Sequence, residues 1–410
     1  MLISIDGNEA NVKNRVGSGT YAFELLKQFH SSSLNSSSWR ERQRPIGSDN
    51  EILSLRSRMT RGNNHQFIVY LKDSPLPDLP KESANFKYKA FGPKKLWTQF
   101  ALPINLTFGL PRRKAGSKPN VFFSTAHYLP RFCPVPMVVT IHDLSFLYYP
   151  EMFRKTDLFQ LKIGSKHSIN NAAHIIAVSQ TTKDDIVKNY QVDPSKITVT
   201  YEGYDKDRFK PQSKSKIESV KSKYKVKGDY IIFVGTLQPR KNLERLIEAF
   251  DIVNGKWKME NGKLQLIIVG KRGWMYYQIF EKVKTLKLDD RIIFTDYVPD
   301  DDLPALISGA TVYVLPSLWE GFGIPVIEAQ ACSVPVVVSK TSSLPEIVGD
   351  SAILIDPESV DSIASGINEV LTDEKKRFDL VKRGFENIKR FSWRNCAQET
   401  LTILEKVASK

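Results

Sequence analysis

The chain has 410 residues, 41% of them hydrophobic and 25% charged. One hydrophobic core stops growing near about 250–300 residues, so this length predicts two domains. The composition excludes a disordered chain, a collagen-like fibre and a small disulfide-stapled scaffold. No apolar run approaches the roughly 18 residues that a membrane-spanning helix needs, and Met1–Asp6 lacks the basic and apolar segments of a signal peptide.

The net charge indicates which partners to expect, and the cysteine content indicates which cellular compartment to expect. The net charge of +14 predicts an anionic partner, which could be nucleic acid, an acidic membrane face or a phosphorylated ligand. The three cysteines, Cys133, Cys332 and Cys396, are odd in number and none belongs to a Cys-x-x-Cys pair. This pattern indicates neither a disulfide framework nor a zinc site, so a reducing, cytoplasmic compartment is expected.

The N-terminal half alternates strand and helix patterns. A strand at Leu2–Asp6 is followed by a glycine loop at 16–20 and by a helix whose apolar residues recur at helical spacing. Residues 31–66 are rich in serine and arginine and are interpreted as a solvated, mobile insertion rather than an anion site. Further short apolar runs of the strand type follow at Phe67–Tyr70, Val121–Ser124, Met137–Ile141, Ile175–Val178 and Ile197–Thr200.

The C-terminal half repeats this alternation after a lysine-rich stretch, residues 206–228, which is interpreted as an interdomain linker. Alternating strands and helices are typical of a parallel sheet with helices on both faces. The expected helices carry apolar stripes within Leu243–Phe250, Ile363–Leu371 and Trp393–Leu404. The expected strands are Tyr230–Val234, Leu264–Val269, Arg291–Phe294, Thr311–Leu315 and Val334–Val338.

The predicted fold class is therefore α/β, with two Rossmann-like, doubly wound parallel-sheet domains at residues 1–205 and 229–385. In open sheets of this kind, ligands bind beyond the carboxyl ends of the strands. A cleft formed by two such edges facing each other is the natural active site.

The segment Pro316–Ala329 follows a predicted buried strand and carries the strongest chemical signal. Pro325 suits the first turn of a helix, so Gly321–Gly323 would precede a helix N-terminus whose free amides attract anions and sugar hydroxyls. Glu320 and Glu328 are eight positions apart, and both carboxylates can face one ligand. Such a pair suits bidentate hydrogen bonding to the vicinal hydroxyls of a ribose or a hexose.

The string from Glu320 to Glu328, filled by Gly-Phe-Gly-Ile-Pro, resembles the Glu-x7-Glu signature of the retaining group 1 (family 4) glycosyltransferases of the two-domain GT-B fold. The resemblance covers most of the chain outside residues 31–66. It implies that the chain transfers a hexose from a nucleotide-sugar donor with retention of anomeric configuration. It also implies that Glu328 holds the donor ribose and Glu320 contacts sugar hydroxyls, with the donor lying beside Gly321, Phe322, Gly323 and Ile324.

A second motif, Gly235–Asn242, follows the first strand of the second domain and opens a helix. Two cations at a helix N-terminus can neutralise a diphosphate, and in a transferase this diphosphate is the leaving group on which charge builds. The resemblance assigns that role to Arg240 and Lys241 and places Gly235 in the donor site. Thr236 stands where many relatives carry an arginine.

The first domain contributes His142 and Asp143, just past the strand Met137–Ile141. The resemblance implies that His142 lies near the anomeric carbon of the donor, where it orients the substrate and stabilises the transition state. His127 is a weaker, acceptor-side candidate. Gly17 and Gly19 match the family's glycine loop and are therefore also expected in the donor site. Glycines let the backbone approach a ligand closely.

Two further segments resemble the family. The strand end Phe294–Val298 matches the place where the nucleotide base lodges, so Val298 is an expected donor contact. Residues 386–410 match the terminal helix that packs back on the first domain.

No metal and no cofactor is expected besides the donor. The acidic run Asp300–Asp302 is interpreted as a helix-start turn rather than a cation site, and Arg240 and Lys241 would replace a divalent ion. Retention without an identifiable nucleophile indicates same-face attack, in which the leaving phosphate accepts the acceptor's proton. The motifs favour a mannosyltransferase that uses GDP-mannose, with a UDP-sugar as the alternative, in polysaccharide or glycolipid synthesis.

Two other classes of protein fit less well. A nucleic-acid binder would interleave aromatic and basic residues on one face, whereas here the lysines concentrate in the linker and the arginines in the insertion. Nucleic acid is therefore not an expected partner. A dinucleotide oxidoreductase would need a third glycine at Ala22 and an acidic residue after the second strand, which ends in Tyr70-Leu-Lys.

Membrane contact is a separate question. The stretches Lys94–Leu102 and Leu110–Lys114 pair apolar residues with cations. Their best apolar set, Trp97, Phe100, Ala101 and Ile104, shares a helical face, and core packing is favoured over a membrane-surface helix. Peripheral contact with an anionic inner membrane face remains an alternative, and with it a lipid-linked acceptor in place of a free saccharide.

Overall fold

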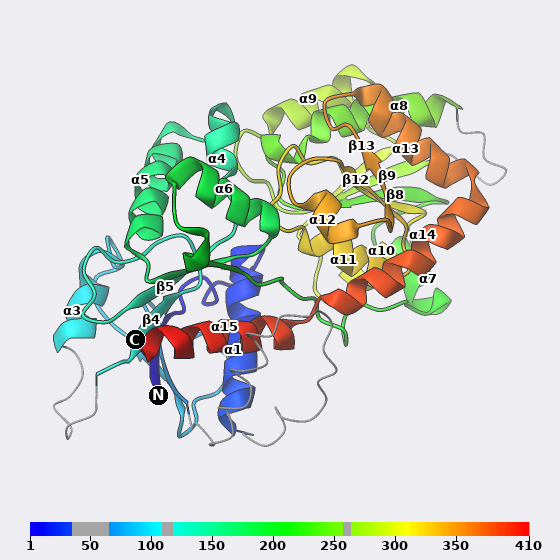
Figure 1. Ribbon diagram of the computed structural model, residues 1–410. Coiled ribbons are helices and arrows are strands. Elements are labelled where there is room, and N and C mark those ends of the chain that lie inside the picture. The colour runs from blue at the N-terminus through cyan, green and yellow to red at the C-terminus, as the bar shows by residue number, and fades with distance from the viewer. Residues whose placement is uncertain (35–64, 109–117, 257–263, 410) are drawn as a thin grey trace.

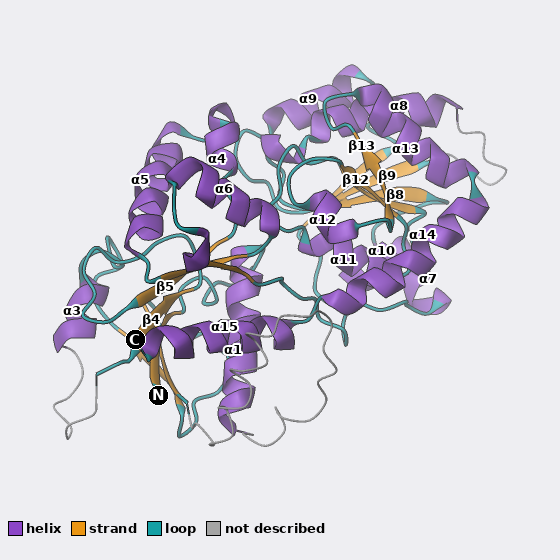
Figure 2. Cartoon of the chain, in the orientation of Figure 1, coloured by secondary structure: helices purple, strands orange, loops and turns teal. Residues whose placement is uncertain are grey.

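The computed structural model describes residues 1–34, 65–108, 118–256 and 264–409, and they form two α/β domains (Figure 1). Each domain contains one parallel sheet with helices on both sides (Figure 2). The prediction of two doubly wound parallel-sheet domains is thereby confirmed.

The first domain is built on a seven-stranded sheet of order β3-β2-β1-β4-β5-β6-β7, and every pair of neighbours is parallel. Its central strands are apolar and buried, as strands covered on both faces must be. The strands are β1 (Leu2–Asp6), β2 (Gln66–Leu71), β3 (Phe86–Ala90), β4 (Val121–Ser124), β5 (Met137–Ile141), β6 (His174–Ala177) and β7 (Ile197–Val199). The helices are α1 (Ser18–Leu34), α3 (Ala101–Phe108), α4 (Ser145–Tyr148), η1 (Pro150–Met152), α5 (Lys155–Asn171), α6 (Gln180–Tyr190) and η2 (Pro194–Lys196).

The second domain has a six-stranded parallel sheet of order β10-β9-β8-β11-β12-β13. The strands are β8 (Tyr230–Val234), β9 (Gln265–Val269), β10 (Ile292–Asp296), β11 (Val312–Leu315), β12 (Val336–Ser339) and β13 (Ala352–Ile355). Helix α7 (Lys214–Lys223) precedes these strands. The helices between and after them are η3 (Pro239–Lys241), α8 (Leu243–Lys256), α9 (Tyr277–Thr285), α10 (Leu303–Ser308), α11 (Ile324–Ala331), α12 (Leu344–Val348), α13 (Val360–Thr372), α14 (Glu374–Asn387) and η4 (Ile388–Arg390).

The last helix, α15 (Trp393–Ala408), returns to the first domain. It lies beside α1 (Figure 1), and the Trp393 ring meets the Tyr21 ring edge-on with 6.1 Å between centroids. The side chains of Trp393, Ala397 and Leu404 are buried in the main hydrophobic core. The chain thus crosses between the domains twice, once after β7 and once before α15.

Of two segments interpreted from the sequence, one has a different structure and the other lies mostly outside the described residues. Residues 206–228, read as a linker, contain the helix α7, whose Val220 is buried in the core. The predicted mobile insertion at 31–66 lies mostly outside the described residues, since only its edges belong to α1 and β2.

The preference for core packing around α3 is half wrong. Trp97 and Ala101 are buried, but Phe100 and Ile104 are 60% and 57% exposed. Helix α3 begins only at Ala101, so the chain before it turns Trp97 inward while Phe100 points to the outside. Within the described residues, no helix is both long and apolar enough to cross a membrane.

Candidate active site

The carboxyl edges of the two sheets meet through the loops that follow β5 and β11. A Cβ atom added to Gly321 would lie 1.9 Å from the carbonyl oxygen of His142 in the other domain. Only a glycine therefore allows the two loops to approach this closely. The contact brings the predicted residues of the first domain next to those of the second.

Three predicted residues of the second domain form one ion-paired cluster. The Nζ atom of Lys241 lies 2.5 Å from Oε1 of Glu320, and the guanidinium of Arg240 lies 3.6 Å from the other oxygen, Oε2. Arg240 also donates a hydrogen bond to the backbone carbonyl of Trp319. The two cations come from η3, immediately after β8, while Glu320 comes from the loop after β11, so adjacent strands place them together.

Electrostatics keep this cluster charged although its side chains are almost buried. Burial alone would raise the pKa of Glu320, but the charges of Lys241 and Arg240 hold it below its usual value. Burial lowers the pKa of Lys241, and the nearby Arg240 acts in the same direction. The Nε atom of Arg240 is buried and has no hydrogen-bond partner within the described residues. The second domain therefore contributes two cations and one carboxylate to the cluster, and the Nε of Arg240 is a hydrogen-bond donor still without a partner.

Asp143 brings a carboxylate to the cluster from the other domain. Its Oδ2 atom lies 4.0 Å from a terminal nitrogen of Arg240. Burial opposes its charge, yet Arg240 and hydrogen bonds from Ser145 lower its pKa to about 2. In the sequence, Asp143 stood out only as the neighbour of His142. Its contact with Arg240 of the other domain, which the structure shows, is what makes it a candidate site residue.

The loop that carries Glu320 is held by the segment after β12. The backbone N–H of Glu320 donates to Oγ of Ser342 at 2.9 Å, and Oγ of Ser343 donates to the carbonyls of Glu320 and Phe322 at 3.0 and 3.2 Å. Ser342 itself has a φ of +56°, an uncommon conformation for a residue with a side chain. The segment after β12 is thus a structural support of the site.

The predicted helix start after Gly323 is confirmed. Helix α11 begins at Ile324 with Pro325 in its first turn, and Gly323 has a φ of +105°, which favours glycine. Phe322 is buried, and its ring packs against Phe391 and Tyr201 at the domain boundary. Ile324 is also buried, so the part of this segment that can meet a ligand is its backbone.

Glu328 is partly buried in the second turn of α11. Burial raises its pKa to about 7, against the opposing charge of Arg208. Arg208 in turn pairs with Asp300 at 2.8 Å. Glu320 and Glu328 both add to the effect of burial in raising the pKa of Tyr313 on β11, so the two carboxylates flank the same strand. The expected base contact, Val298, is buried close to Asp300 in the chain.

His142 is nearly buried, and both of its ring nitrogens have partners in the first domain. Its Nε2 atom lies 2.9 Å from the carbonyl oxygen of Thr125, and Nδ1 lies 3.3 Å from Oε1 of Glu202. Burial would lower its pKa, but Glu202 raises it above the ordinary 6.5. Glu202 is buried on the first crossover, and no spacing in the sequence pointed to it.

Two of the remaining predicted residues, His127 and Gly235, lie beside this centre. The His127 ring lies 5.8 Å from the His142 ring, and burial lowers its pKa to about 4. Gly17 has a φ of +50° just before α1, and Gly19 lies in the first turn of that helix. Gly235 directly follows β8, and an added Cβ there would lie 3.7 Å from Cε of Lys241.

Additional contacts join the domains around the centre. The Trp319 ring stacks on Tyr148 of α4 with 4.1 Å between centroids, and Nε1 of Trp274 donates to the carbonyl of Met152 at 2.7 Å. The carboxylate of Glu346, in α12, accepts hydrogen bonds from the backbone N–H groups of Gln180 and Thr181 at 2.7 and 3.2 Å. Glu346 thereby caps the N-terminus of α6 in the other domain.

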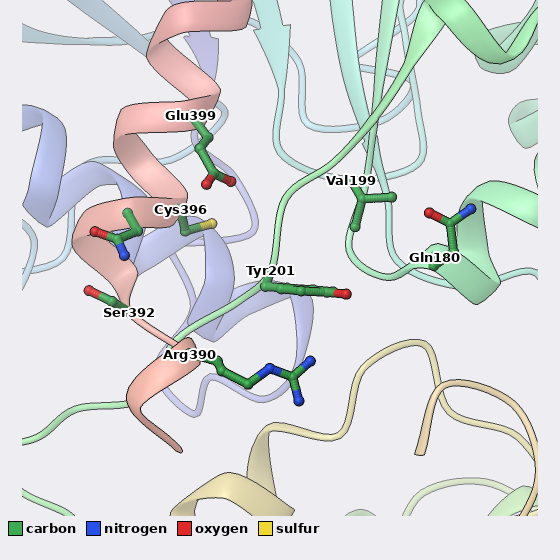
Figure 3. A pocket seen from close by; sticks show the side chains of 8 residues that line it. Gln180, Val199, Tyr201, Arg390, Ser392, Cys396 and Glu399 are labelled. Atoms are coloured by element: carbon green, nitrogen blue, oxygen red, sulfur yellow. The ribbon is translucent and has the colours of Figure 1, made fainter. Parts of the chain in front are cut away.

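A cavity of about 240 Å³ lies between the two crossovers. Figure 3 shows side chains from α15, from the first crossover and from the start of α6 turned toward one opening. Its lining contains none of the predicted donor residues and consists of Gln180, Val199, Tyr201, Arg390, Ser392, Asn395, Cys396 and Glu399. In the described part of the chain, no group of three or more His, Cys, Asp and Glu side chains could hold a metal ion.

Comparison with protein families matches both halves of the chain. Residues 214–387 match the model described as glycosyl transferases group 1, and residues 52–208 match glycosyltransferase family 4. O-antigen chain mannosyltransferase B of Escherichia coli is 33% identical over 71% of this chain and 76% of its own length. O-antigen chain mannosyltransferase RfbU of Salmonella typhimurium is 32% identical over 62% of this chain and 67% of its own.

Solved structures share the fold. Alr3699/HepE of Anabaena, determined in complex with UDP-glucose, superposes with a TM-score of 0.69 at 17% identity and covers 99% of both chains. The two facing Rossmann-like domains are those of the GT-B fold. Together with the matches over both halves, this shows that the chain belongs to the group 1 (family 4) glycosyltransferases and is a hexosyltransferase.

Proposed function

We propose that the protein is a retaining, metal-independent mannosyltransferase that uses GDP-mannose in polysaccharide or glycolipid synthesis. A UDP-sugar is the alternative donor. The observation that carries the proposal is the cluster of Arg240, Lys241 and Glu320 at the meeting point of the two sheet edges. The names of the two bacterial relatives, both O-antigen mannosyltransferases, support mannose as the sugar.

The cations of the cluster suit a leaving diphosphate. Arg240 and Lys241 lie close to Glu320, Arg240 is 4.0 Å from Asp143, and the free Nε of Arg240 adds a donor. Positive charge fixed in a site from which water is excluded stabilises charge that develops in the transition state. This arrangement would replace a divalent ion, so neither a metal nor another cofactor is part of the proposal.

The carboxylate of Glu320 suits hydrogen bonding to sugar hydroxyls. Both of its oxygens lie near cations, which lower its pKa and keep it an acceptor. We therefore assign the proton of the acceptor hydroxyl to the leaving phosphate. The acceptor oxygen attacks the same face of the sugar from which the phosphate leaves. The bond from C1 to the phosphate oxygen breaks as the bond to the acceptor oxygen forms, and configuration is retained.

His142 and Glu328 complete the proposed site. His142 is held by Glu202, and the raised pKa of its ring favours a positive charge beside the transferred sugar. Glu328 would accept hydrogen bonds from the ribose, with Gly17, Gly19, Gly235, Val298 and the 321–324 backbone as further donor contacts. The proposed acceptor is a saccharide or a lipid-linked saccharide, and the proposed location is cytoplasmic, with peripheral contact to the inner membrane face.

Donor binding tests this function directly. The protein is heated with GDP-mannose, GDP, UDP-glucose and mannose, and the melting temperature is recorded, since a ligand of the native state raises it. We expect GDP-mannose to raise it by more than UDP-glucose and free mannose to have no effect. Lys241→Ala should abolish the shift, whereas Lys284→Ala on the exposed side of α9 should keep it. A larger melting-temperature shift with UDP-glucose would identify a UDP-sugar as the donor in place of GDP-mannose. The absence of a shift with any nucleotide sugar would refute the proposed site.

A further inference from the structure

The cavity between the two crossovers lies apart from the proposed donor site. Tyr201 lines this cavity, whereas the next residue of the first crossover, Glu202, turns its carboxylate to His142. The rest of the lining comes from the start of α6, from β7, from η4 and from the first two turns of α15. The ion-paired cluster of the second domain contributes no residue to it. An occupant of this cavity would therefore not compete with the donor.

One wall of the cavity is aromatic and apolar. Figure 3 shows the Tyr201 ring edge-on, with Arg390 on one side and Val199 on the other. The guanidinium of Arg390 lies 5.8 Å from the centroid of this ring, so the cation covers one of its faces. The other face bounds the opening together with Val199 and Cys396. A flat apolar wall of this kind suits the C–H groups on one face of a sugar ring.

Hydrogen-bonding side chains surround this wall. They carry hydroxyl, amide and carboxyl groups and belong to Gln180, Ser392, Asn395 and Glu399. Within the described residues, the carboxylate of Glu399 makes no hydrogen bond and no ion pair. Glu399 is exposed at the opening, yet the surrounding protein excludes enough water to raise its pKa to about 7. A partly desolvated carboxyl group without a partner is costly, and a hydroxyl group of a ligand would supply that partner.

The charge and the size of the cavity indicate an uncharged ligand of one ring. Arg390 is already engaged within the protein, because it donates to Oδ1 of Asn387 at 2.9 Å and to the carbonyl of Glu346 at 3.2 Å. A phosphate or a nucleotide would therefore lie beside Glu399 with no other cation in the lining to neutralise it. The volume of about 240 Å³ is also below the roughly 300–1,000 Å³ of pockets for drug-sized ligands. A single neutral sugar ring meets both conditions.

We propose that this cavity is a second saccharide-binding site, in which one pyranose unit stacks on Tyr201 and donates hydrogen bonds to Glu399 and Asn395. The choice of mannose as that unit rests on the proposed function, whereas the site itself follows from the cavity. An enzyme that extends a polysaccharide meets many such units in one chain, so this site would hold the chain away from its reacting end.

The affinity of this site for one sugar unit is expected to be low. A single ring has few atoms with which to make contacts, so we expect a dissociation constant on the order of 1 mM. Free mannose at the lower concentrations that saturate a donor site would therefore leave the melting temperature unchanged.

Saturation-transfer NMR on the full chain tests the proposal. The probes are methyl α-mannoside, an α-linked mannotriose and the acyclic polyol sorbitol, and GDP is present to occupy the donor site. We expect saturation transfer to both mannosides and none to sorbitol. Asn395→Ala/Glu399→Ala should weaken the binding of methyl α-mannoside roughly ten-fold, because two hydrogen bonds are lost.

A matched control comes from the same face of α15. Thr402 and Lys406 follow Asn395 and Glu399 by seven positions, which is about two helical turns, and they lie outside the cavity. Thr402→Ala/Lys406→Ala should bind the mannosides like the unchanged protein. Unchanged binding by Asn395→Ala/Glu399→Ala would overturn the proposal, as would equal saturation transfer to sorbitol.

A second pair of measurements separates this proposal from the proposed function. Asn395→Ala/Glu399→Ala should keep the melting-temperature shift with GDP-mannose, because neither residue belongs to the donor site. Lys241→Ala should lose that shift and keep the saturation transfer to methyl α-mannoside. Loss of both signals in either variant would show that the cavity is not an independent site and would overturn the proposal.

Discussion

At the scale of single residues, the site depends on partners that no local pattern in the sequence identifies. Lys241, Arg240, Glu320 and His142 stand in motifs, and the structure places them around one centre. Glu202, by contrast, reaches His142 only because the crossover after β7 returns beside β5. A contact between residues sixty positions apart has no periodicity, so sequence reasoning missed it.

Glu202 is expected to control the protonation of His142. Replacing it with Gln removes the charge that raises the pKa of His142, so this pKa should fall. Because the folded state raises the pKa, the pair stabilises the fold below the ordinary pKa of His142 and loses this effect as pH rises through the raised value. The check is an NMR titration of His142 together with the pH dependence of sugar transfer.

The control is Glu369→Gln, which changes a carboxylate on the surface of α13. If Glu202 only fills space, Glu202→Gln will leave both the titration and the pH profile as they are. A shifted profile with an unchanged melting temperature would identify Glu202 as a positioning residue.

Glu328 should make donor binding depend on pH. Its pKa of about 7 comes mainly from burial, with Arg208 lowering it and Asp205 and Asp300 raising it. An ionised carboxylate accepts ribose hydrogen bonds better than a protonated one, so donor affinity should increase as pH rises through about 7. Glu328→Gln should match the unchanged protein about one unit below that pH and bind the donor roughly ten-fold more weakly one unit above it.

Calorimetric titration with GDP-mannose at both pH values checks this prediction. The pKa of His142 is also raised by its surroundings, so the measurement is repeated in the Glu202→Gln background. A pH dependence that persists in Glu328→Gln would assign the effect to another group.

At the scale of elements, the central strands and the edge strands β7 and β10 could be predicted, whereas the edge strands β3 and β13 could not. The buried runs of β1, β4, β5, β8, β9, β11 and β12 are mostly apolar, which makes them visible in a sequence. Strand β3 alternates lysine with aromatic residues, and β13 is short and only partly buried, because both are at sheet edges. Edge strands are half solvated, so their patterns resemble loops.

Helix α12 should act as a clasp between the domains through Glu346. Its carboxylate caps α6 and also accepts the hydroxyl of Tyr201 at 2.9 Å. Removing a helix cap reduces stability by about 1 kcal/mol. Because this cap joins the two domains, its loss weakens the association between them. Glu346→Ala should therefore enlarge the radius of gyration in small-angle scattering and raise the KM for the donor, while each domain stays folded.

Glu386→Ala on α14 is the control, because the carboxylate of Glu386 pairs with Lys389, three residues further along the same domain. An unchanged scattering profile in Glu346→Ala would show that the clasp does not hold the domains together.

At the scale of the whole molecule, the GT-B architecture was predictable because two rounds of strand and helix patterns are visible, whereas the closeness of the domains was not. That closeness depends on Gly321, whose hydrogen meets the His142 carbonyl. Gly321→Ala would place a methyl group there and push the two loops apart. We expect transfer to fall at least ten-fold, since small displacements of reacting groups have large effects on rate.

Gly255→Ala serves as the comparison, because an added Cβ at Gly255 meets no atom within 4 Å. It should leave transfer unchanged and leave stability equal or slightly higher. If Gly321→Ala transfers sugar at the normal rate, the loops do not need this approach for chemistry.

The return of α15 to the first domain has a consequence for biosynthesis. Strands β1 to β7 leave the ribosome early, but the helix that covers α1, with its buried Trp393 and Leu404, is made after the whole second domain. The second domain can complete its core while the first still exposes the apolar surface that α15 covers. The domain begun first is thus finished after the second, and a nascent chain would need protection of that surface until α15 has been made.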